Sequence, residues 1–330
     1  MFFNATDLAG QAVPFFDDRG ADVVIVIAKA TFRKRAQQLS LAGEQVPVRL
    51  SDVPFDPAAI EAGRQSSVRY PSDVGGEKPG ADVVIVGAAV SPKPVTNMEV
   101  AVRAPGASVT LRVHGERVYS RSALGLKFGP SVAFERSPIT YERAYGGGSQ
   151  DGSILDWRNP VGRGVHRSPS ELDEAKAPCI EDPSRPLIAG KETVPVGLGA
   201  LPTWWAPRRD LCGTMDSAWA AERMPLPPLD FNRRFHHVAS PSLQIERPLA
   251  EGDKIATHGM SEERLFDVTV PSLALVAHCR FAASAPVSLP LLLDTALLEP
   301  EDGRVEFTFR RVVPLGRAKT LLREVRLDVA

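Results

Sequence analysis

The chain has 330 residues, of which 43% are hydrophobic and 24% are charged, so it can bury a substantial core and is not a disordered polymer. Its 39 basic and 40 acidic side chains leave a net charge of −1, which excludes a long-range field that would steer nucleic acid or an anionic membrane. No apolar run approaches the roughly 20 residues that cross a bilayer, and the first residues do not have the pattern of an export signal. Together with three scattered cysteines, these features favour a cytoplasmic protein.

Residues 1–129 have the pattern of β-strands. The sequence Gly-Ala-Asp-Val-Val-Ile-Val occurs twice, at residues 20–26 and 80–86, and its β-branched run is typical of a strand buried on both faces. The repeat reflects either a duplicated strand-and-turn unit or the general similarity of such strands. Residues 100–102 and 109–113 alternate apolar with polar side chains on either side of a Pro-Gly turn, which predicts a hairpin.

Residues 242–330 also have a β pattern. Residues 289–298 and 305–313 flank a turn at residues 299–303, and this arrangement predicts a long hairpin. Its second strand alternates between apolar residues (Val305, Phe307 and Phe309) and polar residues on the opposite face (Glu306, Thr308 and Arg310).

Residues 130–241 differ from both flanking zones. They hold 14 of the 29 prolines and all four tryptophans, and no helical or strand period persists in them. The aromatic content argues against disorder, so we expect an ordered, irregular segment, with one short helix at residues 215–221 capped by Thr214. The sequence therefore predicts a single domain over residues 1–330. We expect it to be mainly β, an antiparallel sandwich or barrel-like scaffold with a long Pro/Gly/Trp-rich insert and little helix.

The sequence contains none of the common catalytic or metal-binding motifs. A phosphate loop, a dinucleotide fingerprint, a nucleophile elbow and an H-E-x-x-H zinc motif are all missing. The histidines are isolated except for the adjacent pair His236 and His237, whose side chains diverge. We therefore expect no cofactor, no metal and no catalytic residue. Asp216 and Asp230 are candidates for paired carboxylates of glycoside chemistry, although aspartates in such loops more often cap helices and brace turns.

The tryptophans provide the strongest functional signal. Residues 204–209 read Trp-Trp-Ala-Pro-Arg-Arg, and tryptophan and arginine are the residues most enriched at binding hot spots. The same indoles also suit a small core inside the loop, and the two interpretations are compatible.

Five motifs rich in tryptophan, proline, glycine and arginine follow one another through the insert. They lie at residues 141–147, 159–164, 205–208, 213–216 together with Trp219, and 225–231. This succession resembles the bacterial domain-of-unknown-function family 2169, whose genes lie beside those of type VI secretion spikes and toxins. The resemblance implies a structural role for the family-motif residues Gly146, Gly147, Asn159, Pro160, Gly162, Gly164, Pro207, Gly213, Thr214, Asp216, Asp230 and Phe231.

The resemblance also implies a function. It suggests a non-enzymatic adaptor or chaperone that binds a secreted toxin, a spike or spike-tip protein, or both. From the balanced charge we expect no nucleic-acid partner and no membrane partner. The candidate partner-binding residues are Trp204, Trp205, Arg208, Trp219, Tyr141, Arg143 and Tyr145. The alternatives are a β-scaffold hydrolase that uses Asp216 and Asp230 with a loop histidine, and a carbohydrate-binding protein, either one acting on cell-wall sugar.

Overall fold

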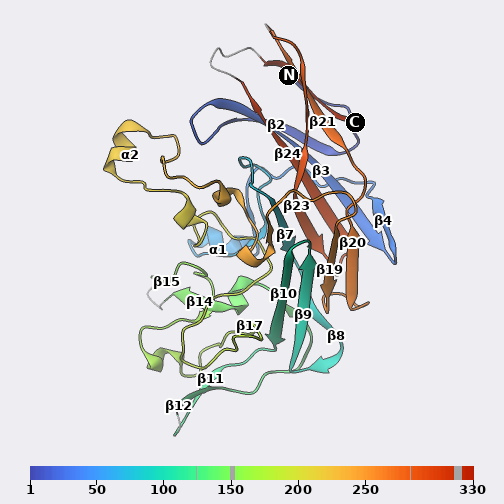
Figure 1. Cartoon of the computed structure of the whole chain (residues 1–330). Coiled ribbons are helices and arrows are strands. Elements are labelled where there is room, and N and C mark those ends of the chain that lie inside the picture. The colour runs from blue at the N-terminus through green and yellow to red at the C-terminus, as the bar shows by residue number, and fades with distance from the viewer. Residues whose placement is uncertain (124, 149–152, 283, 316–321) are drawn as a thin grey trace.

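The computed structural model describes residues 1–123, 125–148, 153–282, 284–315 and 322–330. Strands form most of its regular structure and the helices are short (Figure 1). The predicted mainly β class is therefore confirmed. Within the described residues the longest helix has six residues, and no helix could cross a membrane.

The largest sheet combines strands from both ends of the chain. In the described residues its order is β18-β7-β23-β24-β3-β2, with β4 paired to the end of β3. The bounds are Gln244–Ile245 (β18), Ala81–Ile85 (β7), Leu292–Glu299 (β23), Arg304–Pro314 (β24), Asp22–Arg35 (β3), Ala9–Phe16 (β2) and Gln38–Leu41 (β4). β23 and β24 form the predicted long hairpin, but its first strand begins at Leu292 and not at residue 289, because residues 287–290 pair in another sheet. The two copies of the repeated sequence form β7 and β3 on either side of the hairpin.

Two smaller sheets complete the main scaffold. One has the order β17-β10-β9-β19-β20, and the other has the order β1-β25-β21-β22. Their bounds are Ile180–Glu181 (β17), Ala107–His114 (β10), Asn97–Ala104 (β9), Lys254–His258 (β19), Leu265–Thr269 (β20), Phe2–Asn4 (β1), Leu322–Val329 (β25), Leu275–Phe281 (β21) and Val287–Pro290 (β22). β9 and β10 form the hairpin predicted around Pro105-Gly106, and Gly106 supplies the positive φ of +74° that this turn requires.

Short elements make up the rest. The strands are Val53–Pro54 (β5), Val68–Tyr70 (β6), Ala88–Val95 (β8), Tyr119–Ser122 (β11), Gly125–Phe128 (β12), Phe134–Pro138 (β13), Tyr145–Gly148 (β14), Ile154–Asp156 (β15) and Arg163–Gly164 (β16). The α-helices are Pro57–Glu61 (α1) and Ser217–Glu222 (α2), and the 3₁₀ helices are Tyr141–Arg143, Pro169–Leu172, Arg209–Leu211, Arg233–His236 and Pro241–Leu243. Much of the insert lies beside the sheets as irregular chain, with α2 projecting from the body (Figure 1).

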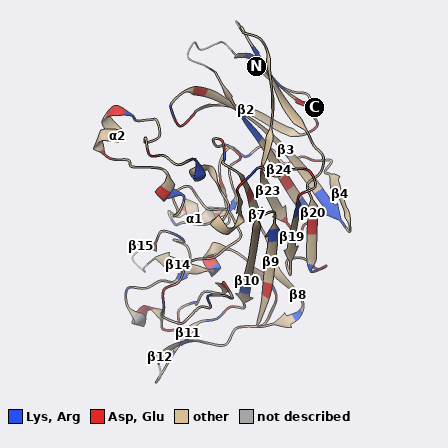
Figure 2. Ribbon diagram, viewed as in Figure 1, with Lys and Arg blue, Asp and Glu red and all other residues tan. Residues whose placement is uncertain are grey.

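One apolar core joins strands from both β zones. Val26 of β3, Val84 of β7, Leu111 of β10 and Ile255 of β19 belong to the same cluster and are at most 2% exposed. Basic and acidic residues are interspersed along the ribbon (Figure 2). The insert and the strands thus surround a common interior.

The polar face of β24 is buried, which its alternating pattern does not predict. Glu306, Thr308 and Arg310 are 5% exposed or less. Arg310 Nη1 donates to Asp294 Oδ2 at 2.6 Å, and Arg49 donates two hydrogen bonds to Glu306, at 2.6 and 2.9 Å. Buried charges are tolerated when they are paired in this way. Both faces of β24 are therefore covered by other parts of the protein.

The predicted helix of the insert begins later than expected and has a different cap. α2 starts at Ser217, and Asp216 Oδ1 accepts a hydrogen bond from the Trp219 amide at 2.8 Å. The prediction that Thr214 caps the helix is therefore wrong. Asp216 is closer to the first turn, and its carboxylate reaches the free backbone donors directly.

Candidate functional site

The two adjacent tryptophans of the insert have different environments. Trp205 is fully buried and packs edge-on against Tyr141, with ring centroids 5.4 Å apart, in a small cluster that includes Leu201 and Val161. Trp204 is 38% exposed and stands edge-to-face on Trp205 at a centroid distance of 5.7 Å. The buried indole therefore supports the exposed one.

Three other predicted partner-binding residues are also buried. Arg208 is 6% exposed, and its guanidinium donates to the carbonyls of Leu201 at 2.5 Å and Phe235 at 3.1 Å. Tyr141 and Tyr145 are 5% and 4% exposed. Like Trp205, these side chains offer almost no surface to a partner in this conformation, and they act by fixing the loop.

The second arginine of this loop, Arg209, is partly exposed. Its guanidinium carbon lies 4.1 Å from the ring centroid of Trp157, which is 44% exposed. The Ala206 amide donates to the Trp157 carbonyl at 2.9 Å, so the two segments are joined by their backbones. We call Trp157, Trp204 and Arg209 the aromatic surface. Trp157 and Arg209 were not among the predicted contacts, although both lie beside family motifs.

A cavity of about 640 Å³ borders the same loop. Its lining includes Ala206, Pro207 and Asp210, together with Val109 and Leu111 of β10. The volume is within the roughly 300–1,000 Å³ of pockets for small ligands, and the cavity lies beside the aromatic surface.

The glycine-rich motifs form a close crossing of two segments. Asn159 is fully buried, and its Nδ2 donates to the carbonyls of Tyr141 and Tyr145, both at 2.8 Å. Gly146 has a φ of +142°, and a Cβ there would lie 2.3 Å from the Asn159 carbonyl oxygen. Pro160, Gly162 and Gly164 belong to the same crossing, which ties residues 141–147 to residues 159–164. These contacts give the motif residues a structural role.

The two candidate carboxylates hold loops together. Asp216 caps α2, and Asp230 accepts hydrogen bonds from the Thr214 amide at 2.9 Å and from its hydroxyl at 2.8 Å. The hydrogen bonds from Thr214 lower the pKa of Asp230. Gly213 lies against the same carboxylate, where a Cβ would come within 2.6 Å of Asp230 Oδ1. We call residues 213–236, which carry α2, the α2 arm. The contact between Asp230 and Thr214 joins the two ends of the loop that contains α2.

The remaining motif residues of the arm are partly buried. Trp219 is half-buried, and its Nε1 donates to the Leu226 carbonyl at 2.8 Å. Phe231 packs against Phe235 and His236, with ring centroids 5.4 Å away in both cases. Trp219 is thus mainly an internal brace of the arm.

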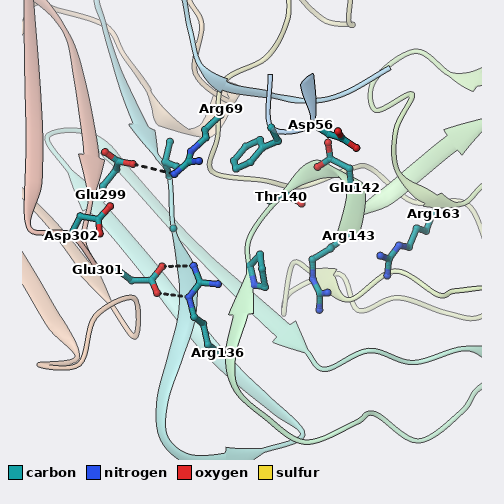
Figure 3. Close-up of a pocket in the computed structure, with 14 residues that line it drawn as sticks. Asp56, Arg69, Arg136, Thr140, Glu142, Arg143, Arg163, Glu299, Glu301 and Asp302 are labelled. Carbon is teal, nitrogen blue, oxygen red and sulfur yellow. Dashed lines mark hydrogen bonds and ion pairs between the residues drawn. The ribbon is translucent and has the colours of Figure 1, made fainter. Parts of the chain in front are cut away.

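A charged cavity of about 740 Å³ lies between β6, β13 and the turn that follows β23. Four arginines and five acidic residues line it, and Figure 3 shows them: Arg69, Arg136, Arg143, Arg163, Asp56, Glu142, Glu299, Glu301 and Asp302. Arg136 donates two hydrogen bonds to Glu301, at 2.6 and 3.1 Å, and Arg69 Nη2 lies 4.0 Å from Glu299. Two of the four arginines are therefore paired with acidic residues of the same lining.

Arg143 is the predicted contact residue that lies at this cavity. It pairs with Glu116, and Arg163 Nη1 bonds the other oxygen of the same carboxylate at 2.8 Å. Burial alone would raise the pKa of Glu116, but the hydrogen bond from Arg163 and the charges of both arginines bring it below its ordinary value. The neighbouring Glu142 accepts from the Ser67 amide and hydroxyl at 2.8 and 2.7 Å. In the described residues, no group of three or more His, Cys, Asp or Glu side chains could hold a metal ion.

Comparison with known protein families assigns the chain to one of them. A family model described as "Uncharacterized protein conserved in bacteria (DUF2169)" matches residues 19–310. The chain belongs to this family. The DUF2169 match spans all five motifs, the aromatic surface and the charged cavity. No curated protein and no solved structure gives a significant match.

Proposed function

We propose that this DUF2169 protein is a non-enzymatic cytoplasmic adaptor that binds a type VI secretion toxin and helps to load it onto the spike or its tip. The observation that carries the proposal is the exposed Trp204 held edge-to-face on the fully buried Trp205. A rigid aromatic anchor loses little conformational entropy on binding, and tryptophan and arginine dominate binding hot spots. Trp157 beneath Arg209 extends the same surface.

The environments of the two aspartates support an adaptor over a hydrolase. A glycoside hydrolase needs two carboxylates that face the substrate, one as an acid and one as a base or nucleophile. Here the Asp216 carboxylate accepts a hydrogen bond from the first turn of α2, and the Asp230 carboxylate accepts one from the Thr214 hydroxyl. Both carboxylates therefore already have structural partners.

Co-expression with a type VI toxin and a spike protein from the same genome tests the proposal. Affinity purification of the tagged adaptor is expected to recover toxin or spike protein in near-equal amounts. Trp204→Ala should abolish this recovery, whereas Phe3→Ala, which removes another exposed aromatic side chain on β1, should not. Recovery that survives Trp204→Ala, or a wild-type protein that recovers neither partner, contradicts the proposal.

A further inference from the structure

A second exposed aromatic surface lies at the end of the largest sheet. Phe15 and Phe16 end the edge strand β2 and are 37% and 53% exposed. They border a hollow of about 210 Å³, whose other walls come from β24, residues 76–77 and the 3₁₀ helix Arg233–His236. We call this cavity the Phe16 hollow. Pockets for drug-sized ligands measure roughly 300–1,000 Å³, so this one fits one or two side chains of a bound chain better than a small molecule.

Contacts with the α2 arm fix one wall of the Phe16 hollow. Arg233 donates two hydrogen bonds to the Asp18 carboxylate, at 3.0 and 3.1 Å, and Arg223 donates to the Asp18 carbonyl at 3.0 Å. Leu226 packs against Gly20 so closely that a Cβ there would lie 2.5 Å from Leu226 Cδ1. The turn after β2 is therefore held in place before any ligand arrives.

The charge of the lining is negative. Among the lining residues, Asp18 pairs with Arg233, and two backbone amides of the same turn donate to Asp17 Oδ1 at 2.9 and 2.7 Å. The three carboxylates of Asp17, Asp18 and Glu77 outnumber the one guanidinium, which leaves the lining with a net charge of −2. Burial lowers the pKa of His236 to about 3, so its ring is neutral at pH 7 and adds no positive charge. An apolar hollow whose lining has a net negative charge is complementary to an apolar side chain that neighbours a cation.

The mode of docking follows from the edge strand itself. Pro14 lies in β2 and has no N–H group, so this edge is poorly suited to accept an added strand. A ligand would instead engage Phe15 and Phe16 through its side chains.

We propose that the Phe16 hollow binds a peptide segment in which an aromatic or branched aliphatic side chain neighbours a lysine or arginine. The apolar side chain packs against Phe15 and Phe16, and the cation meets Asp17 and Glu77. This inference goes beyond the adaptor function, because it rests on its own surface and does not depend on a type VI partner.

Selection from a displayed library of random dodecapeptides on the wild-type protein tests the inference. The enriched peptides are expected to pair an aromatic or branched aliphatic residue with an adjacent lysine or arginine. A fluorescent synthetic copy of the enriched peptide should bind Phe16→Ser about tenfold more weakly by anisotropy. Glu77→Lys should weaken it as well and should favour a copy whose basic residues are replaced by glutamate.

Matched variants make the result decisive. Phe3 is 54% exposed, almost the same as Phe16, so Phe3→Ser is expected to bind the peptide like the wild type. Trp204→Ala should also bind normally, which separates this inference from the adaptor proposal. The inference is overturned if no such peptide is enriched, if Phe16→Ser binds as tightly as the wild type, or if Phe3→Ser or Trp204→Ala loses binding equally. Thermal melting of each variant verifies that it is folded.

Discussion

Lys29 Nζ lies 2.8 Å from Asp73 Oδ2 in the interior of the protein, where the two side chains are 1% and 7% exposed. The same ammonium is 3.0 Å from Glu306 Oε2, and Arg49 donates to both oxygens of that carboxylate, at 2.6 and 2.9 Å. Thr308 Oγ1 donates to Asp73 at 3.2 Å. Residues 49–73, which carry Arg49 and Asp73 at their two ends, are therefore bound to β3 and β24 by a buried ionic network.

The first prediction concerns this network. Lys29→Met should lower the free energy of unfolding by about 3–5 kcal/mol, because it leaves the buried carboxylates of Asp73 and Glu306 without their shared cation. Urea unfolding measures the change. The exposed Arg247–Asp253 pair is the control, and Arg247→Met should cost only about 0–1 kcal/mol. A loss below about 1 kcal/mol for Lys29→Met would contradict the network's importance.

The second prediction is a pH dependence. Burial raises the pKa of Glu306, but hydrogen bonds and charge from Arg49 and Lys29 outweigh it and bring the pKa below its ordinary value of 4.5. A depressed carboxyl pKa stabilises the fold above the unfolded pKa, and this contribution is lost as the pH falls through the folded pKa. Urea unfolding should therefore show stability falling below about pH 4.5, with a shallower fall in Glu306→Gln. Equal slopes in the two proteins would exclude a contribution from Glu306.

The third prediction separates the adjacent tryptophans. Trp205→Ala should cost about 3–5 kcal/mol of stability, because it empties a fully buried site beneath Tyr141. Trp204→Ala should cost about 1 kcal/mol or less, because its indole is partly exposed. Denaturant unfolding of the two variants compares them directly. Equal losses would show that both indoles are structural and would remove the basis for a contact role.

The fourth prediction concerns Asp216. Asp216→Ala should destabilise the protein by about 1 kcal/mol through loss of the α2 cap, whereas Asp216→Asn should be nearly neutral because asparagine caps equally well. Thermal unfolding distinguishes the two. Turnover of cell-wall material by the wild type that disappears in Asp216→Asn would instead establish the hydrolase alternative.

The sequence predicts the regular elements well where a period and a turn coincide. β9–β10 and β23–β24 are found as expected, because alternation and their turns specify both register and reversal. The burial of Glu306 is not predictable in this way. Its counter-charges, Lys29 and Arg49, lie more than 250 residues away in the chain, and Arg49 comes from an irregular segment without a period.

The sequence predicts which loop carries the candidate site, but it does not predict which side chains of that loop are exposed. A motif locates Trp204 and Trp205, but in an irregular segment no periodicity decides which of two neighbours faces inward. Arg208 and Arg209 show the same limit, since the first is buried on carbonyls and the second stacks on Trp157. For the two tryptophans, it is the packing of Trp205 against Tyr141 that decides which indole is buried.

The most direct test of the central claim is a calorimetric titration of the co-purified toxin or spike partner against the wild type, Trp204→Ala and Phe3→Ala. The adaptor account predicts that Trp204→Ala raises the Kd by about tenfold or more, while Phe3→Ala leaves it unchanged. The same Kd for wild type and Trp204→Ala would contradict the claim that this protein holds its partner through the aromatic surface.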